Sequence, residues 1–496
     1  MGFAQSVDLS TLVRGVTRTR TLVVFCLALA GYLAFEWRAV TLDTLFGLTL
    51  GREVWEHGLP HDASTVVLGA GKPWQDQQWL AHLAMYGAYA AFGYGGVVAL
   101  CAACQAGAVA LVARLCGTLG AGLTRTVMWV IAAAAGILMN PVPRAQSIGY
   151  LLLIVTLTLI VGPQTRSRRI ALVAVLVLWG NIHGSAVLGV IACASAVTAH
   201  AIASWRAGRR TGFRGDAVTL AGICLALLAT PYGLSIVSYY RSIFGNDAIR
   251  EVVTEWRGAR FDSVLDSIVL LLLAVLLCGI AFCVGRRVPL NARLVGFALP
   301  LGLAGTQALR SQVWFVLSAG VLLCDLFERA APTTNTADIF ARIFGRLGAS
   351  GPRIAIGLGA ACLLASAFSV ASKAQSAYLD PDERAAVDST ALVLAREPKA
   401  RVFASEDVSQ MLLWRHPELA RGRVGFDIRY EALDQNVFRE VAAALGRGKD
   451  EPALFKRFSL LVVGQDSLLA ATVAKLPGWT PGTKSHGFVR FTRAAA

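Results

Sequence analysis

Charged residues are scarce in this chain. Only 16% of its 496 residues are Asp, Glu, Lys or Arg, whereas 55% are hydrophobic, and a soluble domain carries about a quarter charged residues. The apolar residues also form long runs instead of following the period of an amphipathic helix or a half-buried strand. These features exclude an ordinary soluble protein for most of the chain and indicate a polytopic membrane protein.

Cysteine is missing from the C-terminal part of the chain. All ten cysteines lie in or beside apolar runs, and none follows Cys362. A disulfide framework is therefore excluded in that part and in the loops expected outside the membrane. A cleavable signal is also lacking, because no small-residue cleavage site follows the apolar run 21–40 before Asp43. Three arginines precede this run, which we interpret as a signal anchor with a cytoplasmic N-terminus.

The net charge of +15 does not indicate a nucleic-acid partner. No DNA- or RNA-binding motif is present, and the arginines gather in short loops between apolar runs. The loops expected inside carry about twice as many basic residues as the loops expected outside, as the positive-inside rule requires. We therefore expect membrane lipids, and no nucleic acid, around this protein.

Eleven apolar runs are expected to span the membrane. They cover residues 21–40, 95–113, 126–140, 146–162, 170–182, 185–204, 216–231, 263–284, 293–307, 311–327 and 354–372. The apolar segment 79–92 is short, and we interpret it as an interfacial or re-entrant helix. With the N-terminus inside, an odd number of crossings places the C-terminus outside.

The chain divides into two predicted domains. Residues 1–376 form an α-helical transmembrane domain with a first outer loop at 41–94, and residues 377–496 recover the composition of a small soluble α/β domain. Segments 401–405, 460–464 and 487–493 are typical of strands, and 382–400 has a helical period. We expect this α/β domain to be extracytoplasmic on a cytoplasmic (inner) membrane protein.

Unusual polar residues collect at the outer ends of the predicted spans. Polar groups at membrane depth cost several kcal/mol unless they are paired, so they commonly mark a cavity or a site. Each residue alone also has a structural explanation, and Asp43 in particular suits the N-cap of the helix expected before Gly58 and Pro60. The candidate site residues are Asp43, Asp62, Trp74, Gln78, His82, Arg144, Gln146, Asn181, His183, Tyr232, Glu255 and Arg310.

The first outer loop contains the segments DTLFGLTLGREVWEHGLPHD (43–62), with Asp43, Gly51, Gly58, Pro60 and Asp62, and WQDQQWL (74–80). With these residues it resembles the first outer loop of an uncharacterised group of bacterial membrane glycosyltransferases of the GT-C class. Later landmarks that look similar are Arg144, Gln146, Asn181-Ile-His183-Gly184, Pro231-Tyr232-Gly233, Glu255-Trp256, Arg310 and the C-terminal α/β domain. The chain departs from the group at Gly47, where a histidine is usual, and at Gln78, where a glutamate is common.

The resemblance implies a GT-C-like fold and transfer of a sugar from a polyprenyl-phosphate donor to a glycan, lipid or protein acceptor of the cell envelope. It makes Asp43 the catalytic base, since a carboxylate can accept the proton of an attacking hydroxyl. Arg144 and Arg310 are expected to stabilise the leaving phosphate, and the other candidates to bind substrate. No cofactor is certain, and a divalent metal stays open.

Two other functions stay open on the sequence alone. A transporter or flippase would place ionisable groups near the bilayer midplane and show inverted repeats, and neither feature is evident. A non-catalytic assembly or receptor protein could keep the same fold, and the departures at Gly47 and Gln78 leave room for it.

Overall fold

The computed structural model describes residues 40–138, 142–208, 213–331, 357, 361, 364–446, 453–485 and 487–493. Its N-terminal and central part is helical, with short 3-10 helices η1 (Ala226–Leu228), η2 (Gly233–Ser235), η3 (Thr254–Trp256) and η4 (Leu309–Ser311) between the α-helices. The α-helices are α2 (Leu42–His57), α3 (Trp79–Thr118), α4 (Leu123–Leu138), α5 (Ala145–Val161), α6 (Arg166–Ile182), α7 (Ala186–Arg206), α8 (Phe213–Leu225), α9 (Ile236–Phe244), α10 (Asp247–Val252), α11 (Val264–Gly285), α12 (Ala292–Gln307) and α13 (Gln312–Ala330).

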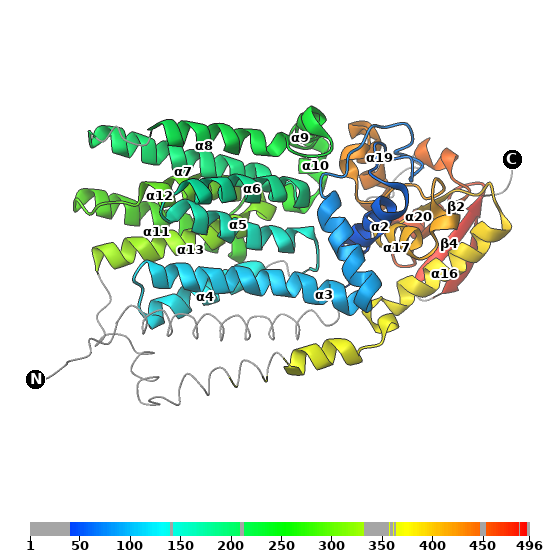
Figure 1. The fold of residues 1–496 in the computed structure, drawn as a ribbon. Helices are drawn as coiled ribbons and strands as arrows, with labels where there is room; N and C mark the ends of the chain where they lie inside the picture. Colours follow the sequence, from blue (N-terminus) through cyan, green and yellow to red (C-terminus); the bar gives the residue numbers. More distant parts are fainter. Residues whose placement is uncertain are drawn as a thin grey trace, which may run out of the picture.

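The C-terminal part combines a small sheet with short helices. The strands are β1 (Val402–Ala404), β2 (Leu460–Gly464), β3 (Trp479–Ser485) and β4 (Phe488–Arg493). The helices are η5 (Gln375–Tyr378), α16 (Pro381–Arg396), α17 (Glu406–Arg415), α18 (Pro417–Ala420), η6 (Tyr430–Ala432), α19 (Gln435–Gly446), η7 (Ala453–Arg457) and α20 (Leu468–Val473). Figure 1 shows the long helices side by side, the C-terminal part at one end of them, and α2 between the two.

Three helices in the described part of the chain, α3, α7 and α11, are long and apolar enough to cross a membrane. The helices Phe213–Leu228 and Gly233–Phe244, which are bent by 86° at their junction, would add a fourth crossing if they form one broken span. These helices support an integral membrane protein. The predicted runs in described regions coincide with helices, but the expectation of about eleven crossings is supported only in part. Helices such as α4, α5 and α6 have 16 or 17 residues, fewer than the ~20 of a straight crossing.

Two of the predicted spans can be compared with the structure only in part; in the second of them, 354–372, the described residues 357, 361 and 364–372 are helical. The run 21–40 lies outside the described residues except for its last residue, and 354–372 lies partly outside them. The membrane orientation, which depends on the number of crossings, stays a prediction.

Segment 79–92 is a helix of its own, as predicted, because α3 (Trp79–Thr118) consists of two helices that meet across a kink at Gly93. Its interfacial or re-entrant placement stays a prediction. Gly93 has φ 65° and ψ −159°, a conformation open to glycine because it has no Cβ. The side chain of Gln375 occupies the space beside Gly93, and its Oε1 accepts a hydrogen bond of 2.8 Å from the Tyr94 N–H. The kink therefore docks α3 onto the chain that leads into the C-terminal part.

The sheet has the order β1-β2-β4-β3. β1 pairs with β2 in parallel, and the β2–β4 and β4–β3 pairs are antiparallel. The strands predicted from the sequence correspond to β1, β2 and β4. β3 escaped prediction because Pro481 and Gly482 interrupt its strand pattern, and its register with β4 shifts between Pro481 and Lys484.

Segment 41–94 and the C-terminal part share one hydrophobic core. Leu48 of α2 and Met85 of α3 belong to the same buried cluster as Leu412 and Val462. The backbone N–H of Val67 also donates to the Val424 carbonyl at 2.8 Å. The C-terminal part is thus packed against α2 and α3, which fixes one side of the site described next.

Candidate active site

A cavity of about 590 Å³ lies where the helical part meets the C-terminal part. Its wall is built from the start of α2, the loop before α3, the start of α5, the turn between α6 and α7, α9, η3, η4 and the segment 428–431. Most of the predicted site residues line it, namely Asp43, Trp74, Gln78, His82, Arg144, Gln146, His183, Glu255 and Arg310. The structure therefore brings these side chains together, although their roles stay predictions.

Asp43 lies in the first turn of α2 and is not its N-cap. The N-cap is Thr41, and the hydroxyl of Thr44 accepts a hydrogen bond of 3.4 Å from the Thr41 N–H. That hydroxyl also donates to the Pro143 carbonyl at 2.7 Å. This bond joins the first turn of α2 to the residue before Arg144, so Asp43 and Arg144 face each other.

Arg144 holds two carboxylates with one guanidinium nitrogen. Its Nη1 lies 3.0 Å from Asp43 Oδ2 and 3.5 Å from Glu255 Oε1. The Arg144 side chain is 11% exposed, whereas that of Asp43 is 39% exposed. Asp43 Oδ1 makes no hydrogen bond to any described residue. The ion pair therefore fixes one carboxylate oxygen and leaves the other available to a ligand.

Arg310, in η4, is the second arginine of the cavity wall. Its guanidinium carbon lies 4.7 Å from the centre of the Trp256 ring, a cation–π arrangement. Among the described residues no carboxylate lies within ion-pair distance of it. His183 is buried nearby, within electrostatic range of Arg310 and Arg144, and its Nδ1 lies 2.7 Å from Ser185 Oγ. This side of the cavity carries positive charge that a phosphate could neutralise.

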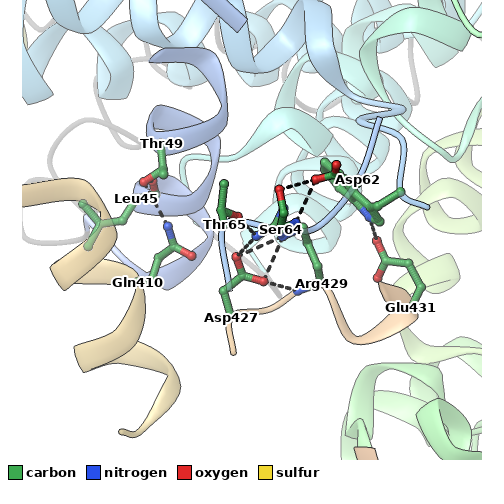
Figure 2. A network of polar contacts seen from close by, with 10 residues as sticks. Leu45, Thr49, Asp62, Ser64, Thr65, Gln410, Asp427, Arg429 and Glu431 are labelled. Carbon is green, nitrogen blue, oxygen red and sulfur yellow. Dashed lines mark hydrogen bonds and ion pairs between the residues drawn. The ribbon is translucent and has the colours of Figure 1, made fainter. Parts of the chain in front are cut away.

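The C-terminal part supplies a wall of the cavity through Ile428, Tyr430 and Glu431. Figure 2 shows the polar network that holds this part of the chain against segment 41–94. Trp74 Nε1 donates to Glu431 Oε1 at 2.9 Å, and the Arg429 guanidinium lies 4.9 Å from the Trp74 ring. Burial raises the pKa of Glu431.

Arg429 is itself fixed from two sides. It pairs with Asp427 inside the protein, at 2.6 Å, and it donates to the Thr65 hydroxyl. Trp74 therefore has its ring face and its indole N–H held by the segment 427–431.

Three predicted site residues do not line the cavity. Asp62 accepts from the N–H of Ser64 at 2.9 Å and from its hydroxyl, and these bonds lower the Asp62 pKa. Asn181 accepts from Trp79 Nε1 at 2.9 Å. The Tyr232 hydroxyl donates to the Pro60 carbonyl at 3.1 Å. These contacts hold loops and helix ends in place, and substrate binding by these residues stays a prediction.

Several cavity residues were not among the predicted ones, namely Asp76, Gln77, Tyr239, Tyr240, Tyr430 and Glu431. Asp76 could have been found, because it lies inside the polar cluster WQDQQW and six residues before His82. Tyr430 and Glu431 carry no such signal, because the contacts that place them join residues more than 350 positions apart.

A metal site does not emerge from the described residues. No group of three or more His, Cys, Asp or Glu side chains in that part of the chain could hold a metal ion. The eight cysteines in the described residues form no disulfide with one another. The carboxylates of Asp43 and Glu255 are directed at Arg144 instead.

No protein-family model matches the chain, and no curated protein matches its sequence. Solved structures do resemble it. The apo form of an oligosaccharyltransferase from Archaeoglobus fulgidus matches with a TM-score of 0.54 and 10% identity, over 90% of this chain and 69% of that chain. The oligosaccharyltransferase AglB from the same organism, in complex with an inhibitory peptide and a dolichol-phosphate, matches with a TM-score of 0.54 and 10% identity, over 96% and 74% of the two chains.

ArnT from Cupriavidus metallidurans in the apo state gives a TM-score of 0.47 at 15% identity, over 98% of each chain. Because the two oligosaccharyltransferase structures are only 10% identical to this chain in sequence, their likeness shows the fold alone. The chain has a GT-C-like fold of the kind found in membrane glycosyltransferases.

Proposed function

We propose that this protein is a membrane glycosyltransferase that transfers a sugar, with inversion, from a polyprenyl-phosphate donor to a glycan, lipid or protein acceptor. The proposed place is the outer face of the cytoplasmic membrane. The observation that carries the proposal is the Asp43 carboxylate, which faces a cavity with two arginines in its wall. The archaeal oligosaccharyltransferase that shares the fold was solved with a dolichol-phosphate, which supports a lipid-phosphate donor.

Asp43 is the general base of the proposed reaction. As the acceptor oxygen bonds to the anomeric carbon, its proton passes to Asp43 Oδ1, the oxygen without a hydrogen-bond partner among the described residues. Arg144 holds Oδ2 at 3.0 Å and so fixes the direction of Oδ1. We therefore assign Arg144 to positioning, because its charge already faces two carboxylates.

Arg310 is the residue that meets the phosphate. As the bond from the anomeric carbon to the phosphate oxygen breaks, negative charge grows on that oxygen, and a preorganised guanidinium stabilises it. Arg310 suits this role because its known contact is with the ring of Trp256 and not with a carboxylate. The attack comes from the side opposite the phosphate, which inverts the anomeric centre.

The acceptor side of the cavity is assigned to the C-terminal part. Tyr430 and Glu431 line the cavity, and they belong to the C-terminal part, which lies at one end of the long helices in Figure 1. A lipid-linked donor needs access from the membrane helices, whereas a polar acceptor needs access from water. The junction of the two parts offers both.

The test is sugar transfer by the purified protein from a panel of fluorescent polyprenyl-phosphate sugars. We expect Asp43→Asn to lower kcat by about 10²-fold or more, which is the range of general-base catalysis. Asp262→Asn is the matched control, since Asp262 is exposed and lies outside the cavity lining. If Asp43→Asn keeps full activity, Asp43 is not the base. If the wild type transfers none of the sugars, the transferase proposal fails and a non-catalytic role gains support.

A further inference from the structure

A second polar pair lies in the cavity wall and is not used by the mechanism above. Asp76 Oδ2 lies 2.8 Å from His82 Nδ1, and the two side chains are only 1% and 3% exposed. Both residues line the cavity. A buried carboxylate is costly unless it is paired and hydrogen-bonded, so this geometry is a specific feature of the site.

The Asp76 carboxylate is held from its own loop. Its Oδ1 accepts a hydrogen bond of 3.0 Å from the Gln78 N–H, and the Asp76 N–H donates to the Tyr232 hydroxyl at 3.2 Å. The remaining oxygen, Oδ2, meets His82. A carboxylate on Nδ1 fixes the orientation of an imidazole and favours a proton on that nitrogen.

The imidazole of His82 is also confined by its packing. The Phe46 ring meets it edge-on, with centroids 5.5 Å apart. Gly47 allows α2 to approach this closely, because a Cβ at position 47 would lie 2.9 Å from Met85 Cε and 3.3 Å from His82 Cδ2. His82 Nε2 has no hydrogen-bond partner among the described residues. Nε2 is therefore the atom of this fixed ring that a ligand can use.

The two arginines Arg144 and Arg310 line the same cavity as His82. His183 lies within electrostatic range of His82, Arg144 and Arg310, so the basic groups of the cavity surround one region. Four carboxylates line the same cavity: Asp76 is paired with His82, Asp43 and Glu255 are paired with Arg144, and Glu431 accepts a hydrogen bond from Trp74.

We propose that His82, oriented by Asp76, is the acid that serves the leaving phosphate. The inference rests on the proposed function and adds a residue to it. The acceptor oxygen bonds to the anomeric carbon, and its proton passes to Asp43. The bond from that carbon to the phosphate oxygen breaks, and its electron pair stays on the oxygen. That oxygen takes the proton of the His82 imidazolium at Nε2, which leaves a polyprenyl phosphate and a neutral imidazole. Solvent then returns a proton to His82 and removes one from Asp43.

The first experiment measures transfer by His82→Gln, His82→Ala and Asp76→Asn. We expect kcat to fall about 10²-fold in the His82 variants, within the range for acid catalysis, while KM for the donor changes less than about threefold. Added imidazole should raise the rate of His82→Ala at least tenfold, a result that a structural role of His82 would not give. Asp76→Asn, a positioning variant, should lose less activity than His82→Ala and should not respond to imidazole. His57→Gln is the control, because His57 is an exposed histidine on α2.

A second experiment does not depend on turnover. Geranylgeranyl phosphate should raise the Tm of the wild type by mass action, and geranylgeraniol, which lacks the phosphate, should not. His82→Gln should lose most of this increase, and His57→Gln should keep it. A His82→Gln protein that keeps the phosphate-dependent increase in Tm, or that keeps kcat within threefold of the wild type, overturns the inference. If the wild type shows the increase but transfers no sugar, the proposed function fails while the anion site at His82 stands.

Discussion

Asp43 Oδ2 and Arg144 Nη1 lie 3.0 Å apart although their residues are 101 positions apart in the chain. The contact follows from the neighbouring hydrogen bond between the Thr44 hydroxyl and the Pro143 carbonyl, which joins the start of α2 to the chain that enters α5. Two helix ends are thus held in register by one neutral bond and one ion pair. The position of the proposed base is therefore a property of the packing of α2 on the helical part.

Arg144→Lys should separate the geometry of this contact from its charge. Arg144 Nη1 forms ion pairs with both Asp43 and Glu255. The ammonium group of a lysine lacks the planar set of donors that a guanidinium has. We expect kcat to fall by about tenfold or more, with a smaller change in KM, in the same transfer assay. Arg241→Lys, at an exposed position of α9, should behave as the wild type. An unchanged kcat in Arg144→Lys would mean that charge alone is enough.

Arg429→Leu should destabilise the wall that the C-terminal part contributes. Arg429 and Asp427 form a buried ion pair, and removing one partner leaves the other charge buried and unpaired, at a cost of about 3–5 kcal/mol. We expect a clear decrease in Tm and the loss of the contact between the Arg429 guanidinium and the Trp74 ring. The double variant Asp427→Asn with Arg429→Leu is the control, because it removes both charges and should recover part of the lost stability. Equal Tm values for the single and double variants would argue against a buried charge as the cause.

The helices and most strands could be predicted from the sequence because long apolar runs and short β-branched segments depend on local composition. The gathering of Asp43, Arg144 and Arg310 could also be predicted, since residues at the same ends of neighbouring helices lie close together. The orientation of His82 could not be predicted, because it depends on Phe46 and Gly47 of another helix. The break between 79–92 and 95–113 was predicted, but the Gln375 side chain that packs beside Gly93 was not, since it comes from about 280 residues further along.

Glu383 predicts how stability changes with pH. Burial, together with Asp407 and Asp380, raises the pKa of Glu383 to about 7 from its usual value of 4.5. Between these two values the folded state keeps a proton that the unfolded chain releases, so stability from this group falls as the pH rises. Glu383→Gln removes the effect. The Tm of the variant minus the Tm of the wild type should therefore increase between about pH 4.5 and 7 and stay constant at higher pH. At pH 4 the Glu383 carboxyl is mostly protonated in both the folded and the unfolded state, so the Tm difference measured at that pH is the internal control. A Tm difference that is constant with pH would contradict the shifted pKa.

Gly51→Ala tests the close packing of α2 on α3, on which both Asp43 and His82 depend. A Cβ at position 51 would lie 2.1 Å from the His82 carbonyl oxygen, which is backbone and cannot move without moving α3. Overpacking of this kind costs about 1–3 kcal/mol, so we expect a lower Tm and, because both helices shift, a lower kcat as well.

Gly87→Ala is the matched control, because Gly87 is exposed in α3 and has open space where a Cβ would be. Alanine is favoured over glycine in a helix interior by about 1 kcal/mol, so Gly87→Ala should leave kcat unchanged and should keep or raise the Tm. If the two variants behave alike, α2 and α3 do not approach as closely as described. In that case the shared support of Asp43 and His82 has to be abandoned.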